Sequence, residues 1–354
     1  MTYEIVVLTN MAIAVLFALS LNVITGFCGQ VSLGHAAFLG VGAYTSAMLS
    51  KAGVPMVITF IPAMGMAALI GLIVGVASLR VRHDFLAITT MGVVFLFTGI
   101  VRKQELLGGE IGIAGIPAPD FGRIGLLVTS LLCVLAYLLF TIWIRRSWTG
   151  FAFDSISEDE DTATLLGINV PKFKLFAFIV GTAGAGLAGA LYAHQVRFIG
   201  PDSFGFVESI SVLAMVIVGG IGSIWGVILS AAFLSALPQF FQVIDDYKLL
   251  VYGLLLFGAM RFAPDGITRA RAGRAPRSAS CLLCSWLNTE EYKRACRTPP
   301  AERRARGREV PLKLRSAPAV IMFRSYSRPQ SNHIDAGSAL RRPKRTTSRE
   351  CGSS

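Results

Sequence analysis

Residues 29–44 read GQVSLGHAAFLGVGAY, a stretch too apolar for a loop and too rich in glycine for an ordinary membrane-spanning helix. In hydrocarbon, a broken helix is tolerated only where protein or a water-filled cavity satisfies its backbone. Residues 219–226, GGIGSIWG, repeat this behaviour in the second half of the chain. Paired interruptions of this kind indicate a translocation pathway, whereas close helix packing is the alternative reading of such small residues. The candidate pathway residues are Gly29, Gln30, Ser32, Gly34, His35, Gly219, Gly220 and Gly222.

The composition is that of a membrane protein, with 53% hydrophobic and 15% charged residues. A soluble domain has about 25% charged residues, so this chain has too few charges to cover a water-facing surface. The net charge of +12 is concentrated at one end: residues 1–264 hold 13 Lys and Arg against 14 Asp and Glu, whereas residues 265–354 hold 20 against 7. The apolar body is therefore nearly neutral, and its charge gives no indication of nucleic-acid binding.

The apolar runs predict an all-α, polytopic transmembrane bundle of about eight spans with glycine-broken helices. A helix needs about 20 apolar residues to cross a bilayer. The candidate spans are 5–25, 33–50, 54–78, 85–101, 124–144, 174–194, 207–221, 225–241 and 249–262. Together they make residues 1–264 a transmembrane domain. Gly181, Ala185 and Gly189 share one helix face, which predicts tight helix contacts.

Basic residues in short loops set the orientation of such a bundle. The largest hydrophilic loop, residues 145–174, begins with Arg145 and Arg146 and ends near Lys172 and Lys174, so we expect it in the cytoplasm. Counting spans from this loop places the N-terminus and residues 102–123 outside.

The segment from residue 265 onward changes character abruptly, since it is rich in Arg, Ser, Pro and Ala and has no sustained hydrophobic period. Such a segment cannot bury enough apolar area to offset its conformational entropy. We expect a disordered tail, or one translated from a shifted reading frame; an arm that binds anionic lipid or RNA is the alternative.

The cytoplasmic loop contains a predicted short helix. Ser157 is a candidate N-cap, and the acidic residues after it suit the first helical turn. Gly167 is the expected C-terminal stop, and Pro171 prevents continuation. A short helix along the membrane face suits docking to a partner, although a plain connector is the alternative. The candidate docking residues are Glu158, Asp159, Glu160, Ala163 and Gly167.

Several motifs in order resemble the permeases of branched-chain amino acid ABC transporters, of the LivM type. They are Gly26–Tyr44, Glu158–Asn169, Ala185–His194, Pro201–Phe206 and Val218–Gly226. The resemblance covers nearly all of residues 1–264 and has no counterpart for the tail.

This resemblance implies half of an importer channel in the bacterial inner membrane. Its partners would be a second permease of the LivH type, two cytoplasmic ATPases and a periplasmic solute-binding protein, with membrane lipid around it. Glu158–Gly167 would be the coupling helix that contacts an ATPase. Phe151, Ser157 and Thr162 replace Arg, Arg and Ala of the family pattern, which removes two basic residues from this contact.

The sequence offers no enzyme active site. It has no G-x-x-x-x-G-K-[ST] phosphate-binding loop, nucleophile elbow or metal-ligand cluster, so we expect no catalytic residues, no cofactor and no metal. ATP hydrolysis would then belong to partner subunits. An ion-coupled secondary transporter is a further alternative, but it normally places carboxylates at mid-membrane. Urea, short amides or other amino acids are alternative solutes.

Overall fold

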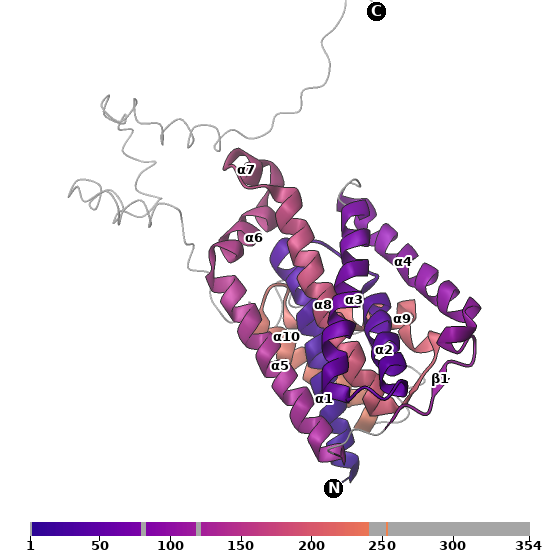
Figure 1. Ribbon diagram of the computed structural model, residues 1–354. Helices are drawn as coiled ribbons and strands as arrows, with labels where there is room; N and C mark the ends of the chain where they lie inside the picture. Colours follow the sequence, from indigo (N-terminus) through magenta and orange to yellow (C-terminus); the bar gives the residue numbers. More distant parts are fainter. Residues whose placement is uncertain (1, 79–82, 118–121, 241–252, 254–354) are drawn as a thin grey trace, which may run out of the picture. The chain divides into compact units, whose positions relative to one another are not determined.

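The computed structural model describes residues 2–78, 83–117, 122–240 and 253, all within the compact unit Met1–Gly273 (Figure 1). These residues are almost entirely helical, as the sequence predicts. The candidate span 249–262 and the tail lie outside the described residues, apart from Gly253. The boundary at residue 264 therefore stays a prediction.

The long helices follow the apolar runs of the sequence. The elements are α1 (Thr2–Leu21), the π-helical turn η1 (Asn22–Phe27), α2 (His35–Lys51), α3 (Met56–Ser78), α4 (His83–Lys103), η2 (Glu105–Leu107), β1 (Ile113–Ala114), α5 (Gly122–Arg146), α6 (Trp148–Glu158), α7 (Glu160–Leu165), α8 (Val170–Val196), β2 (Phe198–Ile199), η3 (Pro201–Phe204), α9 (Phe206–Gly219) and α10 (Ile224–Phe240). The two short strands pair antiparallel, with Ile113 opposite Ile199.

Among the described residues, six helical segments are long and apolar enough to cross a membrane, and they correspond to α1 with η1, α3, α4, α5, α8 and α9 with η3. Helix α2 has 17 residues, and α10 is described over 17 residues as far as Phe240. At about 1.5 Å per residue α2 is roughly 26 Å long, which is less than the approximately 30 Å hydrocarbon core. The six long helices, α2 and the described part of α10 agree with a bundle of about eight spans.

Helix α8 lies at the centre and packs against α1, α2 and α3. Small residues permit these approaches, as the sequence predicts: a Cβ on Gly189 would lie 1.9 Å from the carbonyl oxygen of Leu39 on α2. A Cβ on Gly71 of α3 would lie 2.1 Å from Thr182 Oγ1 of α8. In contrast, α4 and α5 have mostly exposed surfaces that suit contact with lipid or a partner.

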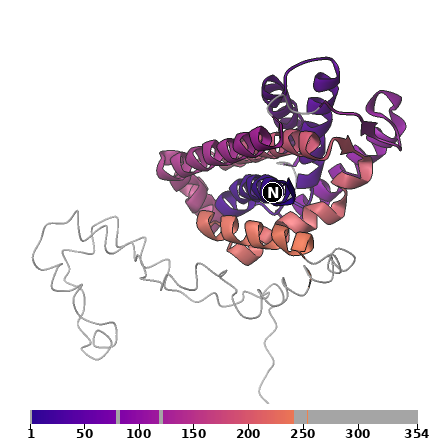
Figure 2. The ribbon, with the colours of Figure 1, turned by 90° about the horizontal axis from the view of Figure 1, so that it is seen from below.

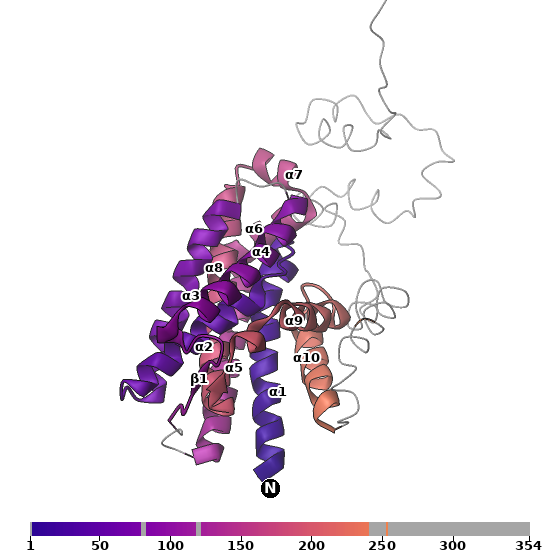
Figure 3. The same cartoon turned by 90° about the vertical axis from the view of Figure 1, so that its right-hand side faces the viewer.

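Helix α1 is enclosed by α5, α8, α9 and α10, as the view along it shows (Figure 2). Helix α10 returns along α1, since Tyr3 Oη donates a hydrogen bond to the Gln239 carbonyl. Helix α9 crosses the bundle and meets the start of α10 beside the upper part of α1 (Figure 3).

The N-terminus lies at the opposite end of the bundle from α6 and α7 (Figure 1). The strand β1 lies towards the N-terminal end (Figure 1), and Arg102 at the end of α4 forms an ion pair with Asp202 of η3 at 2.6 Å. Arg145 and Arg146 end α5 and Lys174 lies in the first turn of α8, so the positive-inside rule predicts that the end with α6 and α7 faces the cytoplasm. The orientation stays a prediction.

Candidate functional site

The link between α9 and α10 is built from glycine. Gly220 has φ +99° and Gly222 has φ +80°, conformations that side chains disfavour. The Gly222 N–H donates to Asn22 Oδ1 at 3.1 Å. A Cβ on Gly222 would lie 2.8 Å from the Gly26 carbonyl oxygen, so the two backbones are in close contact.

The partner of this link is η1, the π-helical turn that ends the first span. A π-helical turn inside an α-helix frequently marks a functional site. Here it turns the fully buried Asn22 towards Gly222, and a Cβ on Gly26 would lie only 2.0 Å from Asn22 Oδ1. The amide of Asn22 therefore satisfies backbone that hydrocarbon would leave unpaired.

The link before α2 is held by hydroxyl groups from other helices. The Leu33 N–H donates to Thr90 Oγ1 of α4 at 3.0 Å, and the Ala36 N–H donates to Ser209 Oγ of α9 at 3.1 Å. A Cβ on Gly34 would lie 2.2 Å from the Thr90 carbonyl oxygen. The free N–H groups of a helix start are thus capped by tertiary contacts.

His35, the first residue of α2, is completely buried. Its Nε2 lies 2.7 Å from Ser20 Oγ, and its ring stacks on Phe17 with centroids 5.1 Å apart. These contacts give His35 a structural role between α1 and α2, and its place in a translocation pathway stays a prediction. Within residues 2–78, 83–117 and 122–240, no three His, Cys, Asp or Glu side chains gather as metal ligands.

The two glycine-rich segments are held by different neighbours. Gly29, Gln30, Ser32, Gly34 and His35 lie in the link before α2 and at its start, and Gly219, Gly220 and Gly222 lie at the end of α9 and in the link after it. The first segment reaches α9 through Ser209, and the second reaches the first span through Asn22.

Sequence reasoning missed the polar partners Asn22, Thr90 and Ser209. For Asn22 a signal exists, because an amide inside the apolar run 5–24 needs a partner. In η1, the link before α2 and the start of α2, four buried polar atoms have no hydrogen-bond partner among the described residues: Asn22 Nδ2, Thr25 Oγ1, Ser32 Oγ and His35 Nδ1.

At the end of the bundle opposite the N-terminus, Asp159 separates α6 from α7. Its backbone is extended (φ −162°), and its carboxylate accepts hydrogen bonds from Thr162 Oγ1 at 2.6 Å and from the Asp161 N–H at 3.1 Å. The Thr162 and Asp161 hydrogen bonds lower the pKa of Asp159. Asp159 is therefore the N-cap of α7.

The prediction that Ser157 is the N-cap of this short helix was wrong. It lies within α6, and its hydroxyl donates to the Asp154 carbonyl at 2.9 Å. Helix α6 continues to Glu158, so Asp159 is the first residue with an extended backbone. Its carboxylate accepts two hydrogen bonds from the start of α7. Pro171 occupies the first turn of α8, where its missing N–H is harmless.

Helix α7 is anchored on one side and exposed on the other. Ala163 is fully buried, and Glu160 forms an ion pair with Lys174 of α8. Gly167, at φ +80°, ends the segment as predicted. The exposed side carries two leucines, Leu165 at 85% and Leu166 at 55% exposure. These leucines, absent from the predicted docking residues, are the apolar surface that α7 offers.

Comparison with known proteins agrees with this architecture. Residues 5–260 match the family model described as branched-chain amino acid transport system / permease component. The chain is 34% identical over 301 residues to the high-affinity branched-chain amino acid transport system permease protein LivM of Escherichia coli K12, covering 75% of this chain and 69% of that one.

It is 33% identical to LivM of Salmonella typhimurium, covering 73% of this chain and 68% of the relative. It is 26% identical to the permease BraD of Pseudomonas aeruginosa, covering 71% of this chain and 90% of BraD. No solved structure matches the chain. With its long apolar helices, the chain is a multi-pass protein of the inner membrane. It belongs to the branched-chain amino acid transport permease family, as its motifs indicate.

Proposed function

We propose that this chain is a permease subunit of an ABC importer and carries branched-chain amino acids inward. ATP would be hydrolysed by two cytoplasmic ATPases, and a periplasmic binding protein would deliver the solute. A second permease of the LivH type would complete the channel. The names of the relatives support this solute, and the chain is also 33% identical over 135 residues to LivH of Escherichia coli K12.

The observation that carries the proposal is the geometry of α7. Leu165 and Leu166 leave apolar surface exposed to water at the cytoplasmic end. Each square ångström of this surface that a partner covers would stabilise the complex by about 25 cal/mol. A partner surface that covers these leucines removes this penalty. We infer that α7 is the coupling helix and that an ATPase is the protein that covers it.

A rigid connection supports the transmission of movement from α7. The Glu160–Lys174 ion pair and buried Ala163 fix α7 to the start of α8. Farther along α8, a Cβ on Gly181 would lie 2.4 Å from Ile24, a residue of η1. A displacement of α8 would therefore act on η1, which holds the link between α9 and α10 through Asn22.

The two links are the proposed translocation pathway. Their glycines permit the backbone to bend, and Asn22 Nδ2 and Ser32 Oγ are buried polar atoms available to a passing solute or to water. When the pathway opens, the backbone N–H groups of the links leave Thr90, Ser209 and Asn22 and form hydrogen bonds with other partners.

The test compares two leucines with nearly equal exposure at opposite ends of the bundle. Leu165 of α7 is 85% exposed and Leu106 of η2 is 83% exposed. We expect Leu165→Asp to weaken recovery of the ATPases with the tagged permease about 5- to 30-fold, because removing an interface anchor costs roughly 1–2 kcal/mol. Leu106→Asp should leave recovery unchanged. Equal recovery with both variants would refute α7 as the docking helix.

A further inference from the structure

The exposed face of α5 is apolar over nearly its whole length. Every exposed residue from Ile124 to Trp143 is hydrophobic, and the larger ones between them are Val128, Leu131, Leu132, Leu135, Leu139 and Phe140. At about 1.5 Å per residue this stripe is roughly 29 Å long, which matches the approximately 30 Å hydrocarbon core of a bilayer. The residues that follow Trp143 therefore lie at the level of the lipid headgroups.

Two tryptophans and two arginines lie where this stripe ends. Trp143 is 66% exposed, and Trp148, the first residue of α6, is 65% exposed. Tryptophan is enriched at membrane–water interfaces because its ring is amphipathic. Arg145 and Arg146, which lie between them in the sequence, are both exposed. We call these four residues the interfacial cluster.

The arginines of the interfacial cluster have no carboxylate partner. Neither forms an ion pair within the part of the chain that the structure describes. Arg145 instead lies over the ring of Phe27, with its Cζ atom 5.6 Å from the ring centroid. Such a cation–π contact holds the guanidinium against the bundle, and its N–H groups stay available as donors. The cluster therefore presents positive charge without a protein anion to balance it.

The acidic residues of α6 begin beyond the cluster. The first of them, Asp154, comes six residues after Trp148 and so lies about 9 Å farther along the helix. Helix α6 leads from the end of α5 towards α7, so the acidic residues after Asp154 follow in that direction (Figure 1). The Trp148 ring contacts Phe173 of α8, with centroids 5.7 Å apart, and Phe173 follows the basic residue Lys172. The charge at the cluster itself is therefore positive.

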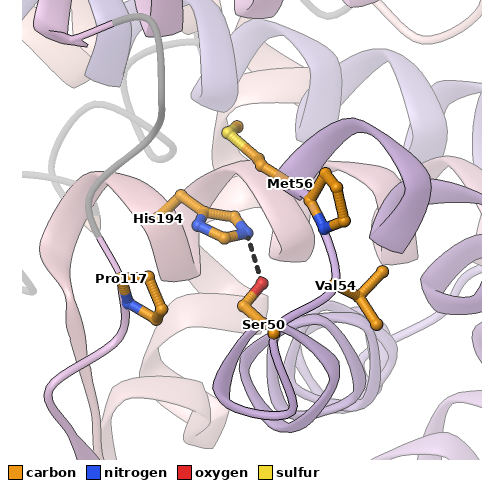
Figure 4. Close-up of a pocket in the computed structure, with 7 residues that line it drawn as sticks. Ser50, Val54, Met56, Pro117 and His194 are labelled. Atoms are coloured by element: carbon orange, nitrogen blue, oxygen red, sulfur yellow. Dashed lines mark hydrogen bonds between the residues drawn. The ribbon is translucent and has the colours of Figure 1, made fainter.

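The end of the bundle where α8 finishes offers an anion less. Arg102 is already paired there with Asp202. A pocket of about 230 Å³ at this end has His194 as its only basic lining residue, and His194 Nε2 faces Ser50 Oγ at 3.3 Å (Figure 4). Residues 1–142 contain no tryptophan, so Arg102 and Lys103 have no indole beside them in the sequence. The combination of tryptophan and unpaired arginine thus belongs to the other end of α5.

We propose that the interfacial cluster binds an anionic phospholipid of the surrounding membrane. The lipid phosphate accepts hydrogen bonds from Arg145 and Arg146, and the indole rings of Trp143 and Trp148 lie against the glycerol region. Hydrogen bonds between arginine and phosphate are charge-assisted and of the stronger kind, and anionic lipids attract basic residues next to a membrane span. The proposal rests on neither the solute nor the ATPases.

Brominated lipids test this site on the full chain in bilayers, because bromine quenches the fluorescence of a nearby tryptophan. The chain has four tryptophans, and Trp225→Phe/Trp286→Phe leaves Trp143 and Trp148 as reporters. Bilayers of equal parts phosphatidylglycerol and phosphatidylcholine would carry bromine on one lipid or on the other. We expect brominated phosphatidylglycerol to quench about two- to fivefold more than brominated phosphatidylcholine, the effect of roughly one basic residue near a charged surface. Equal quenching by the two lipids would overturn the proposal.

Two arginine substitutions locate the preference. Arg145→Gln/Arg146→Gln should bring the quenching ratio to one. Lys103→Gln/Arg123→Gln removes the same charge from exposed positions at the end of α4 and the start of α5, and should leave the ratio unchanged. A ratio that survives in the first variant, or that falls equally in both, would show that the cluster does not create the preference.

Salt provides a measurement that needs no substitution in the cluster. Raising NaCl from about 0.1 M to about 1 M shortens the Debye length from about 10 Å to about 3 Å. The quenching ratio should then fall towards one, because the attraction between guanidinium and phosphate is partly screened. An unchanged ratio at high salt would mean that the tryptophans select the lipid without the arginine charges, which contradicts the proposal.

Discussion

Gly167→Val tests the coupling helix through backbone strain alone. Gly167 has φ +80°, and a Cβ added there would meet nothing within 4 Å. The penalty therefore comes only from the left-handed conformation, which costs a residue with a side chain about 1–2 kcal/mol. This corresponds to a factor of about 5–30 in the population of the native turn. The segment after α7 should move to relieve the strain, while the hydrocarbon-spanning helices are unaffected.

The matched control is Gly122→Val at the start of α5. Gly122 has φ +67° and also has nothing within 4 Å of an added Cβ, so it carries the same kind of strain at the external end. Both variants should insert in the membrane.

The assay is solute-stimulated ATP hydrolysis by the reconstituted complex. Gly167→Val should reduce the stimulation several-fold and weaken recovery of the ATPases, whereas Gly122→Val should change neither. Normal stimulation in Gly167→Val with the ATPases still bound would mean that the loop is only a connector.

Three further expectations concern the bundle, the orientation and the tail. Asn22→Ala should lower the free energy of unfolding by about 1 kcal/mol in SDS titrations, because the hydrogen bond to Gly222 is lost while an unpaired Nδ2 is removed. The control Thr141→Val removes a hydrogen bond inside a single helix and should lower it less. A larger loss in Thr141→Val would contradict the role of Asn22 as a cap. In intact cells with a cysteine-free background, an impermeant thiol reagent should label Glu110→Cys but not Asp159→Cys; labelling of the latter would invert the orientation. Removing residues 267–354 should leave membrane insertion and complex assembly unchanged, and failure to assemble would show that the tail is structural.

The spans could be predicted because long apolar runs have few structural alternatives. The glycine-rich stretches were also readable, because glycine at Gly220 and Gly222 permits a turn that other residues resist. The same runs do not reveal that α2 is too short to cross alone, since apolar residues lie beyond the ends of this helix.

The partners of the broken helices depend on tertiary proximity. Thr90 lies 57 residues from Leu33 along the chain, and Ser209 lies 173 residues from Ala36. Threonine and serine are common in membrane helices and usually bond to their own backbone, so neither residue stands out. At α7, Ser157 and Asp159 were both possible N-caps from the sequence, and Asp159 takes this position because α6 extends through Glu158.

The most direct test of the central claim is uptake of radiolabelled leucine by proteoliposomes. The chain would be reconstituted with the second permease, the ATPases and the binding protein. ATP would be supplied on the side of the membrane that the ATPases face. We expect accumulation only when every component and ATP are present, and none with this chain alone. ATP-driven uptake by the lone chain, or a complete system that transports no branched-chain amino acid, would contradict the account.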